Sequence, residues 1–110
     1  MKNQTEKTTE YVDYTPAADI VAMDNAIKLY LDLPGANKDC LNINIEDHTL
    51  KISADTGVIY NGKSLRYSRS FSISDEIDTK QIAANINSGV LEMELPIAES
   101  AKPFQIKVTG

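Results

Sequence analysis

The sequence has no tryptophan, only two phenylalanines and a single cysteine among its 110 residues. One cysteine excludes an internal disulfide, and the scarcity of large aromatic residues predicts an aliphatic core. Acidic residues outnumber basic ones by 16 to 11, which gives a net charge of −5. This balance argues against a nucleic-acid-binding surface or a basic membrane-binding helix. No apolar run marks the N-terminus, so we expect no signal peptide or membrane-spanning segment and, by default, a cytoplasmic protein.

The length and the apolar share of 42% fit one domain with a sizeable core. Residues 1–15 are polar apart from Tyr11, Val12 and Tyr14. Such a segment buries too little apolar surface to offset the entropy of ordering it, so we expect a short mobile arm. After this arm we expect a domain over residues 16–96 and a tail over residues 97–110.

Apolar and polar residues alternate along most of the domain, which is the pattern of half-buried strands. The expected strands cover residues 19–23, 27–33, 41–46, 50–54, 58–60, 70–74 and 90–95. Turn residues separate them, at Pro34-Gly35, Asp47-His48, Asn61-Gly62 and positions 87–89. Residues 75–84 are the one helical candidate. We therefore predict an all-β fold, an antiparallel immunoglobulin-like β-sandwich.

Few residues suggest chemistry. His48 is interpreted as an exposed turn residue and Cys40 as a small, partly covered thiol. Asp75, Glu76 and Asp78 lack the spacing of a calcium loop and fit the acidic start of a helix. No catalytic residue, cofactor or metal site is therefore expected.

The letters GVIYNGKS, at residues 57–64, match a phosphate-binding loop. Such a loop needs a helix directly after it, and residues 65–69 read as a strand. Its interior is also bulky where closely spaced backbone amides are required. The context therefore argues against a nucleotide site.

Four stretches together carry a resemblance: PAADIVAMDNAIKLYLDLPGANKD, LNINIEDHTLKISA, YSRSFSI and IAANINSGVLEMELP. The signature positions within them are Pro34, Gly35, Arg69, Phe71, Ala84, Gly89, Val90 and Leu91. In this order and spacing, residues 16–108 resemble the α-crystallin domain of the small heat shock proteins. The arm is shorter and more polar than in that family, and residues 55–67 are shorter than the loop that bacterial and plant members exchange.

The chain ends on FQIKVTG, in which Ile106 and Val108 alternate with polar residues. The resemblance implies that this Ile-x-Val motif docks in an edge groove of a neighbouring chain, as an extended strand adding to a sheet. The implied groove residues, also candidates for client binding, are Leu41, Ile43, Ile45, Ala84 and Ile86. The alternative is that the segment folds back as an edge strand of its own sandwich.

By the resemblance the protein is an ATP-independent chaperone that holds unfolding clients. It would form a homodimer, and through tail docking a larger homo-oligomer. The implied dimer interface contains Arg69 with Val58, Ile59 and Tyr60. Residues 58–60 either exchange between chains or fold into a local hairpin, and Arg69 is either an interface residue or an exposed strand residue. The alternative functions are an adaptor sandwich that binds one folded partner and, on GVIYNGKS alone, a nucleotide-binding enzyme.

Overall fold

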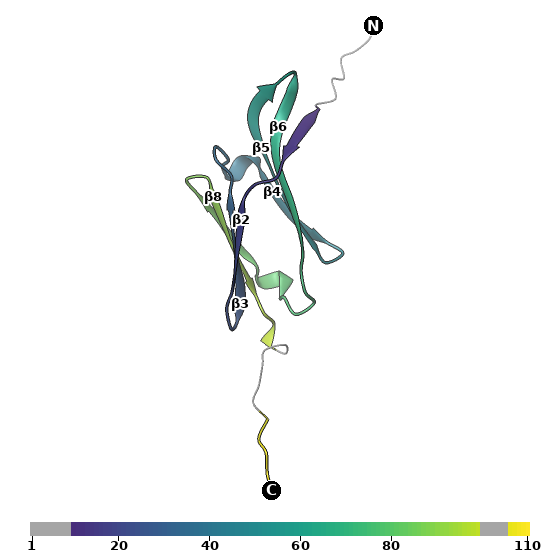
Figure 1. Ribbon diagram of the computed structural model, residues 1–110, viewed down its shortest axis with the longest axis vertical. Helices are drawn as coiled ribbons and strands as arrows, with labels where there is room; N and C mark the ends of the chain where they lie inside the picture. The colour runs from purple at the N-terminus through teal and green to yellow at the C-terminus, as the bar shows by residue number, and fades with distance from the viewer. Residues whose placement is uncertain (1–9, 100–105) are drawn as a thin grey trace.

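The computed structural model describes residues 10–99 and 106–110. In this part of the chain eight strands form two sheets (Figure 1). The strands are β1 Tyr11–Tyr14, β2 Ala18–Ala22, β3 Ala26–Asp32, β4 Leu41–Glu46, β5 Thr49–Tyr60, β6 Lys63–Ser72, β7 Ala83–Asn87 and β8 Val90–Pro96. Two short 3-10 helices, η1 Lys38–Cys40 and η2 Thr79–Gln81, lie in the connections. No helix in the described residues is long and apolar enough to cross a membrane.

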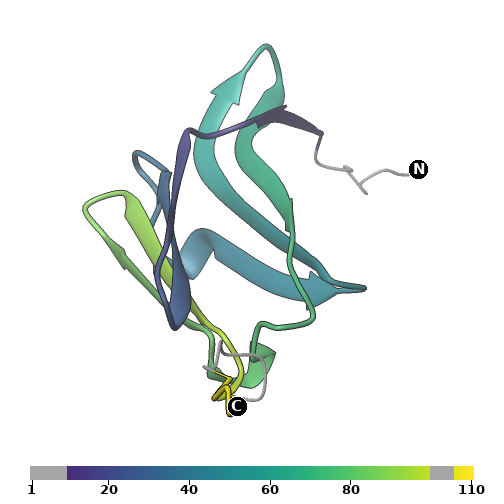
Figure 2. The same ribbon diagram turned by 60° about the horizontal axis from the view of Figure 1, so that its bottom comes forward.

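The two sheets pack as a sandwich, which confirms the predicted fold class. Sheet A has the strand order β1-β6-β5-β4, and sheet B has the order β2-β3-β8-β7. Every pairing is antiparallel except that of β1 with β6. Figure 2 shows the chain leaving β1 on one sheet and entering β2 on the other through residues 15–17.

The core lies between the sheets and is aliphatic, as the composition predicts. Alternate residues of β3, β5 and β8 point inward because side chains alternate between the two faces of a strand. The fully buried large side chains are Leu31, Leu33, Leu50, Ile52, Leu91, Met93 and Pro16. Burial of each large aliphatic side chain contributes about 1.5–3 kcal/mol relative to leaving it exposed.

Three predicted turns are confirmed by their backbone angles. Asn61 and Gly62 have φ of 53° and 78°, as the two central residues of a type I′ hairpin turn require. Asp47 and His48 also have positive φ, and the β7–β8 turn ends on Gly89 with φ of 78°. Asparagine, aspartate and glycine tolerate this region better than other residues. The turns therefore set the register of three hairpins.

The helical candidate over residues 75–84 is one short turn of helix and no more. Only Thr79–Gln81 are helical, and the Asp78 carboxylate accepts a hydrogen bond from the Lys80 N–H at 3.2 Å. Upstream, Ile77 is buried and pairs with Ile97 in an isolated β-bridge. This long-range contact keeps the segment extended, and ten residues form a marginal helix without packing to support it. Capping by an acidic residue is confirmed for Asp78.

The arm expected over residues 1–15 does not lie wholly outside the sheets. Tyr11–Tyr14 form β1, which pairs in parallel with residues 64–67 of β6. The Arg66 Nε donates to Asp13 Oδ1 at 2.8 Å, and its guanidinium lies 4.2 Å from the centre of the Tyr11 ring. These contacts join residues more than fifty positions apart, so the local polar composition does not reveal them.

Candidate binding groove

The β4 and β7 strands form the neighbouring open edges of the two sheets. A pocket of about 190 Å³ lies between them, lined by Lys38, Leu41, Ala84, Asn85, Ile86 and Leu91. Leu91 is fully buried, and Leu41 and Ile86 pack against the core from the two edges. The apolar pocket is therefore continuous with the core and opens beside both edge strands.

Local sequence places each wall of this groove. Asn37 caps η1: its side-chain oxygen accepts from the Asp39 N–H at 2.9 Å, and its backbone N–H lies 3.4 Å from the Cys40 sulfur. This cap turns the chain directly into Leu41 at the start of β4. Cys40 is half-buried against the core, as predicted. On the other wall, the β7–β8 turn at Gly89 brings Ala84 and Ile86 beside β8.

The structure brings together three of the five residues predicted for the groove: Leu41, Ala84 and Ile86. Ile43 packs against the core one pair of residues further along β4, and Ile45 is 37% exposed. These two lie along the same edge strand, outside the pocket itself. Among residues 10–99 and 106–110, both edge strands have a sheet neighbour on one side only, so their outer backbone groups can pair with an added strand.

The tail residues of the Ile-x-Val motif are outside the sheets. Ile106 and Val108 are 74% and 88% exposed, and residues 106–110 belong to no strand. The alternative that Ile106 and Val108 form an edge strand of their own sandwich is therefore wrong for these residues. Phe104 and the residues next to it lie outside the described part of the chain.

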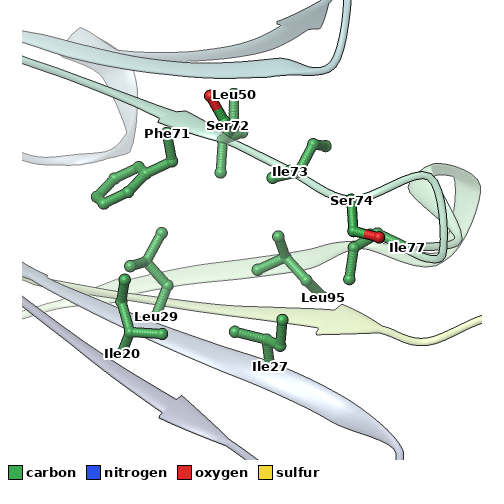
Figure 3. Close-up of a pocket in the computed structure, with 10 residues that line it drawn as sticks. All are labelled: Ile20, Ile27, Leu29, Leu50, Phe71, Ser72, Ile73, Ser74, Ile77 and Leu95. Atoms are coloured by element: carbon green, nitrogen blue, oxygen red, sulfur yellow. The ribbon is translucent and has the colours of Figure 1, made fainter.

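A second apolar pocket lies on another flank of the sandwich, and the sequence analysis missed it. Its volume is about 260 Å³, and Figure 3 shows its walls: Ile20, Ile27, Leu29, Leu50, Phe71, Ser72, Ile73, Ser74, Ile77 and Leu95. Side chains of β2 and β3 face those of β6 and of the segment that follows β6. The sequence signal for this pocket was the alternation of Phe71 and Ile73, because two apolar side chains on one face of a strand end require other residues to pack over them.

The other chemical candidates are placed as follows. His48 is exposed in its turn, as predicted, with its Nε2 2.6 Å from Asp75 Oδ1. No group of three or more metal-ligating residues occurs in the described ranges. The GVIYNGKS segment is a β-hairpin: Gly57 sits in a bulge, and Lys63 begins β6 where a phosphate loop would need a helix. The phosphate-loop hypothesis is therefore wrong on structural context.

The predicted dimer-interface residues lie in two places. Arg69 is half-buried; its Nη1 donates to the Pro16 carbonyl at 2.7 Å and its guanidinium lies 5.0 Å from the Phe71 ring centre. Val58, Ile59 and Tyr60 are 53%, 66% and 67% exposed at the end of β5. Here they form a local hairpin with β6, in which Tyr60 pairs with Lys63.

One carboxylate beside this hairpin has a perturbed pKa. The Asp55 carboxylate accepts from the Gly57 N–H at 2.9 Å and from the Ser64 hydroxyl at 3.0 Å. These two donors, the backbone N–H first, hold the Asp55 pKa below its ordinary value of 3.8, because they stabilise the ionised form. The interaction fixes the bulge that ends the regular part of β5.

A sandwich of two four-stranded sheets with an apolar groove between its open edges is the α-crystallin type of fold. The sequence model of the Hsp20/alpha crystallin family matches residues 19–109, and the chain belongs to this family. An 18 kDa heat shock protein of Streptomyces albus G is 34% identical over 87 residues, covering 70% of this chain and 61% of that protein. Small heat shock protein C2 of Rickettsia felis is 30% identical over 105 residues, which cover 86% of this chain and 68% of that protein.

Solved structures agree on the fold. A small heat-shock protein from Xylella fastidiosa superposes with a TM-score of 0.67 at 24% identity, covering 88% of this chain and 98% of that one. Heat shock protein 16.0 from Schizosaccharomyces pombe gives the same TM-score at 23% identity, and the match covers 86% of this chain and 77% of that one. The chain spans about three fifths of the length of the 18 kDa relatives that it matches.

Proposed function

We propose that this protein is an ATP-independent holdase, which covers the apolar surface of unfolding proteins and keeps them from aggregating. The observation that carries the proposal is the apolar groove between β4 and β7, which opens beside two unpaired sheet edges. An unfolding chain offers what such a groove accepts: an extended backbone that adds to an edge and alternate apolar side chains that fill pockets. The process needs neither bond chemistry nor nucleotide.

We propose also that the protein is a homo-oligomer whose assembly uses the same groove. The exposed Ile106 and Val108 are two residues apart, so in an extended segment they point the same way. They would enter the groove of a second copy beside Leu41, Ala84 and Ile86. Burial of each contributes about 1.5–3 kcal/mol before the cost of ordering the tail. Docked tails would also shield the open edges from unwanted pairing.

The test is the turbidity of a heat-labile client, warmed with an equimolar amount of the protein and no nucleotide. We expect suppressed aggregation. A failure to suppress it, with the protein still folded at that temperature, would reject the holdase proposal and favour an adaptor that binds one folded partner.

A pair of neighbouring substitutions tests the groove. Ala84→Trp fills the pocket, whereas Ala83→Trp alters the preceding residue, which does not line it. Because successive side chains of a strand point to opposite faces, the two variants change the same strand on different sides. We expect Ala84→Trp to weaken suppression and the Ala83→Trp control to keep most of it. Equal activity of the two variants would locate client binding elsewhere.

A further inference from the structure

The outer face of sheet B has an acidic hollow beside the candidate groove. The volume of the hollow is about 290 Å³, and it is lined by Ala83, Ala84, Asn85, Glu92 and Glu94. Ala84 and Asn85 also line the pocket of the groove, so the hollow and the groove share the β7 edge. A segment that adds to β7 would therefore present side chains to both.

The strand register assigns the residues of β7 to the two faces of sheet B. Ala84 and Ile86 pair with fully buried residues of β8, so their side chains point toward the groove. Their neighbours point outward, because successive side chains of a strand alternate between faces. The outward pairs of β7 and β8 are Ala83 with Glu94 and Asn85 with Glu92. The two glutamates therefore stand one strand behind the β7 edge, on the outer face.

The hollow carries more negative charge than its own sheet balances. Lys28 of β3 has its Nζ 3.4 Å from Glu92 Oε2, and it lies directly across from Glu94 in the strand register. Among residues 10–99 and 106–110, Glu94 has no ion-pair partner within 4 Å. Two carboxylates thus share one lysine. The small side chain of Ala83 leaves them open to a cation that approaches from the β7 edge.

The tail carries such a cation between its two docking residues, Ile106 and Val108. In an extended segment Lys107 points away from this pair. When the pair enters the groove against the inward residues of β7, Lys107 lies opposite Asn85 on the outer face. This position is the same for a parallel and an antiparallel tail, because Asn85 is midway between those inward residues. Glu92 is then two strand spacings away, about 9.5 Å between backbones, which two long side chains can span.

The β4 edge gives the same tail a different electrostatic environment. A tail paired with β4 at the mouth of the groove would place Lys107 opposite Asn42, whose β5 partner is Ser53. The charged neighbours of Ser53 on that face are Lys51, which has the same sign, and Asp55, whose carboxylate already accepts two hydrogen bonds. The outer face of sheet B therefore attracts the cation of the tail more strongly than the outer face of sheet A.

We infer that the acidic hollow binds Lys107 of the docking tail of a second copy, and that this contact directs the tail backbone to the β7 edge. Burial of the apolar pair holds the tail in the groove, and the cation selects which wall of the groove it pairs with. Charge complementarity of this kind contributes more to specificity than to affinity. The inference rests on the proposed docking of tails and adds the residue that selects the edge.

Two full-length variants isolate a single docking event for the test. Ile106→Ala with Val108→Ala keeps the groove open and lacks the docking pair, so we call it the groove chain. Ala84→Trp fills its own groove and keeps the tail, so we call it the tail chain. Titration calorimetry of one into the other measures the dissociation constant of tail docking.

Charge reversal on each side then tests the hollow. We expect Lys107→Glu in the tail chain and Glu94→Lys in the groove chain each to raise the dissociation constant by roughly three- to tenfold. The two reversed chains together should recover most of the affinity. Asp24→Lys in the groove chain is the control, because it makes the same charge change at the exposed β2–β3 turn, away from the β7 edge of sheet B.

A dissociation constant that Lys107→Glu leaves unchanged, or reversed chains that do not recover, would overturn the inference. Tighter docking of the Lys107→Glu tail, together with tighter docking of the unreversed tail on Lys51→Glu, would assign the tail to the β4 edge instead. Hydrogen exchange gives a second readout. We expect the tail chain to slow amide exchange in β7 of the groove chain, and slower exchange in β4 alone would contradict the assignment.

The outcome also separates this inference from the proposal on which it rests. Binding between the two chains that does not depend on charge would keep tail docking and reject the role of the hollow. Absence of binding between the unreversed chains would reject tail docking, and the inference with it.

Discussion

Gly89 lies directly against Pro34. A Cβ built on Gly89 would come within 3.2 Å of the Pro34 Cα and 3.3 Å of the Leu33 carbonyl oxygen. The Gly89 carbonyl also accepts a hydrogen bond from the Leu33 N–H at 2.7 Å. The turn between β7 and β8 is thus bonded to the backbone that follows β3, and two signature positions of the sequence meet in space.

Gly89→Ala should destabilise the domain more than Gly62→Ala. Both glycines have φ of 78°, where an alanine costs about 1–2 kcal/mol, but only Gly89 has backbone atoms within 4 Å of the added Cβ. We expect the Gly89 variant to lose at least about 1 kcal/mol beyond the Gly62 variant, and Gly89→Val to lose more. Urea unfolding measures the difference. Equal losses would mean that the β7–β8 turn moves away from Pro34 without cost.

Ile106→Ala with Val108→Ala should reduce the mass of the assembly. The reason is the loss of two apolar side chains that we propose to dock in the groove of another copy. Lys107→Ala with Thr109→Ala is the matched control, because these residues alternate with the docking pair in the same segment. Light scattering over a range of concentrations measures the mass. If both double variants keep the mass of the parent, tail docking does not hold the assembly together.

Asp55→Asn should remove a part of the acid sensitivity of the fold. The folded-state pKa of Asp55 is depressed by the Gly57 N–H and the Ser64 hydroxyl, so its ionised form stabilises the native state. This contribution is fully present above the unfolded pKa of about 4 and is lost as the pH falls through the lower folded pKa. The parent should therefore lose more stability than Asp55→Asn when the pH is lowered from 5 to 2.

Urea unfolding across this range measures the effect. Asp24→Asn is the control, because Asp24 is exposed and has no hydrogen-bond or ion-pair partner in the described residues. If Asp55→Asn and Asp24→Asn follow the same pH profile, the hydrogen bonds to Asp55 do not contribute to the folding equilibrium.

Arg69→Ala should destabilise the single chain. It leaves the carbonyl of the fully buried Pro16 without its 2.7 Å hydrogen bond, which costs about 1–3 kcal/mol. Because Pro16 lies in the crossover from β1 to β2, amide exchange in β1 should also accelerate. Lys51→Ala, which removes an exposed cation from β5, is the control. Unchanged stability combined with a lower mass would instead assign Arg69 to the interface between chains.

Local patterns in the sequence predicted most of the sandwich. Alternation along residues 90–95 defined β8, and Asn61-Gly62 defined a hairpin, because these signals act between neighbours in the chain. The strand β1 could not be found in this way, since it depends on Arg66 contacting Asp13 and Tyr11. Gly57 was also misleading: it matches the first glycine of a phosphate loop, whereas in the structure its N–H bonds to the Asp55 carboxylate in a bulge of β5.

The candidate groove was predicted in part, and the resemblance to a family supplied the pairing of its two walls. Alternation marks Leu41, Ile43 and Ile45 as one face of a strand, but only the packing of the sheets shows which of them lies opposite Ile86. The second apolar pocket also combines segments that are distant in sequence. It cannot be read from a window of neighbouring residues.

The placement of the tyrosines determines what the intrinsic fluorescence of this protein reports. There is no tryptophan, and all five tyrosines are exposed or half-buried, outside the aliphatic core. Tyr14, Tyr60 and Tyr67 lie on β1, β5 and β6, which are neighbouring strands of sheet A, and the rings of Tyr14 and Tyr67 meet edge to face with centroids 5.9 Å apart. Tyrosine emission is therefore a weak signal for melting of the core and a sensitive one for contacts made at this end of sheet A.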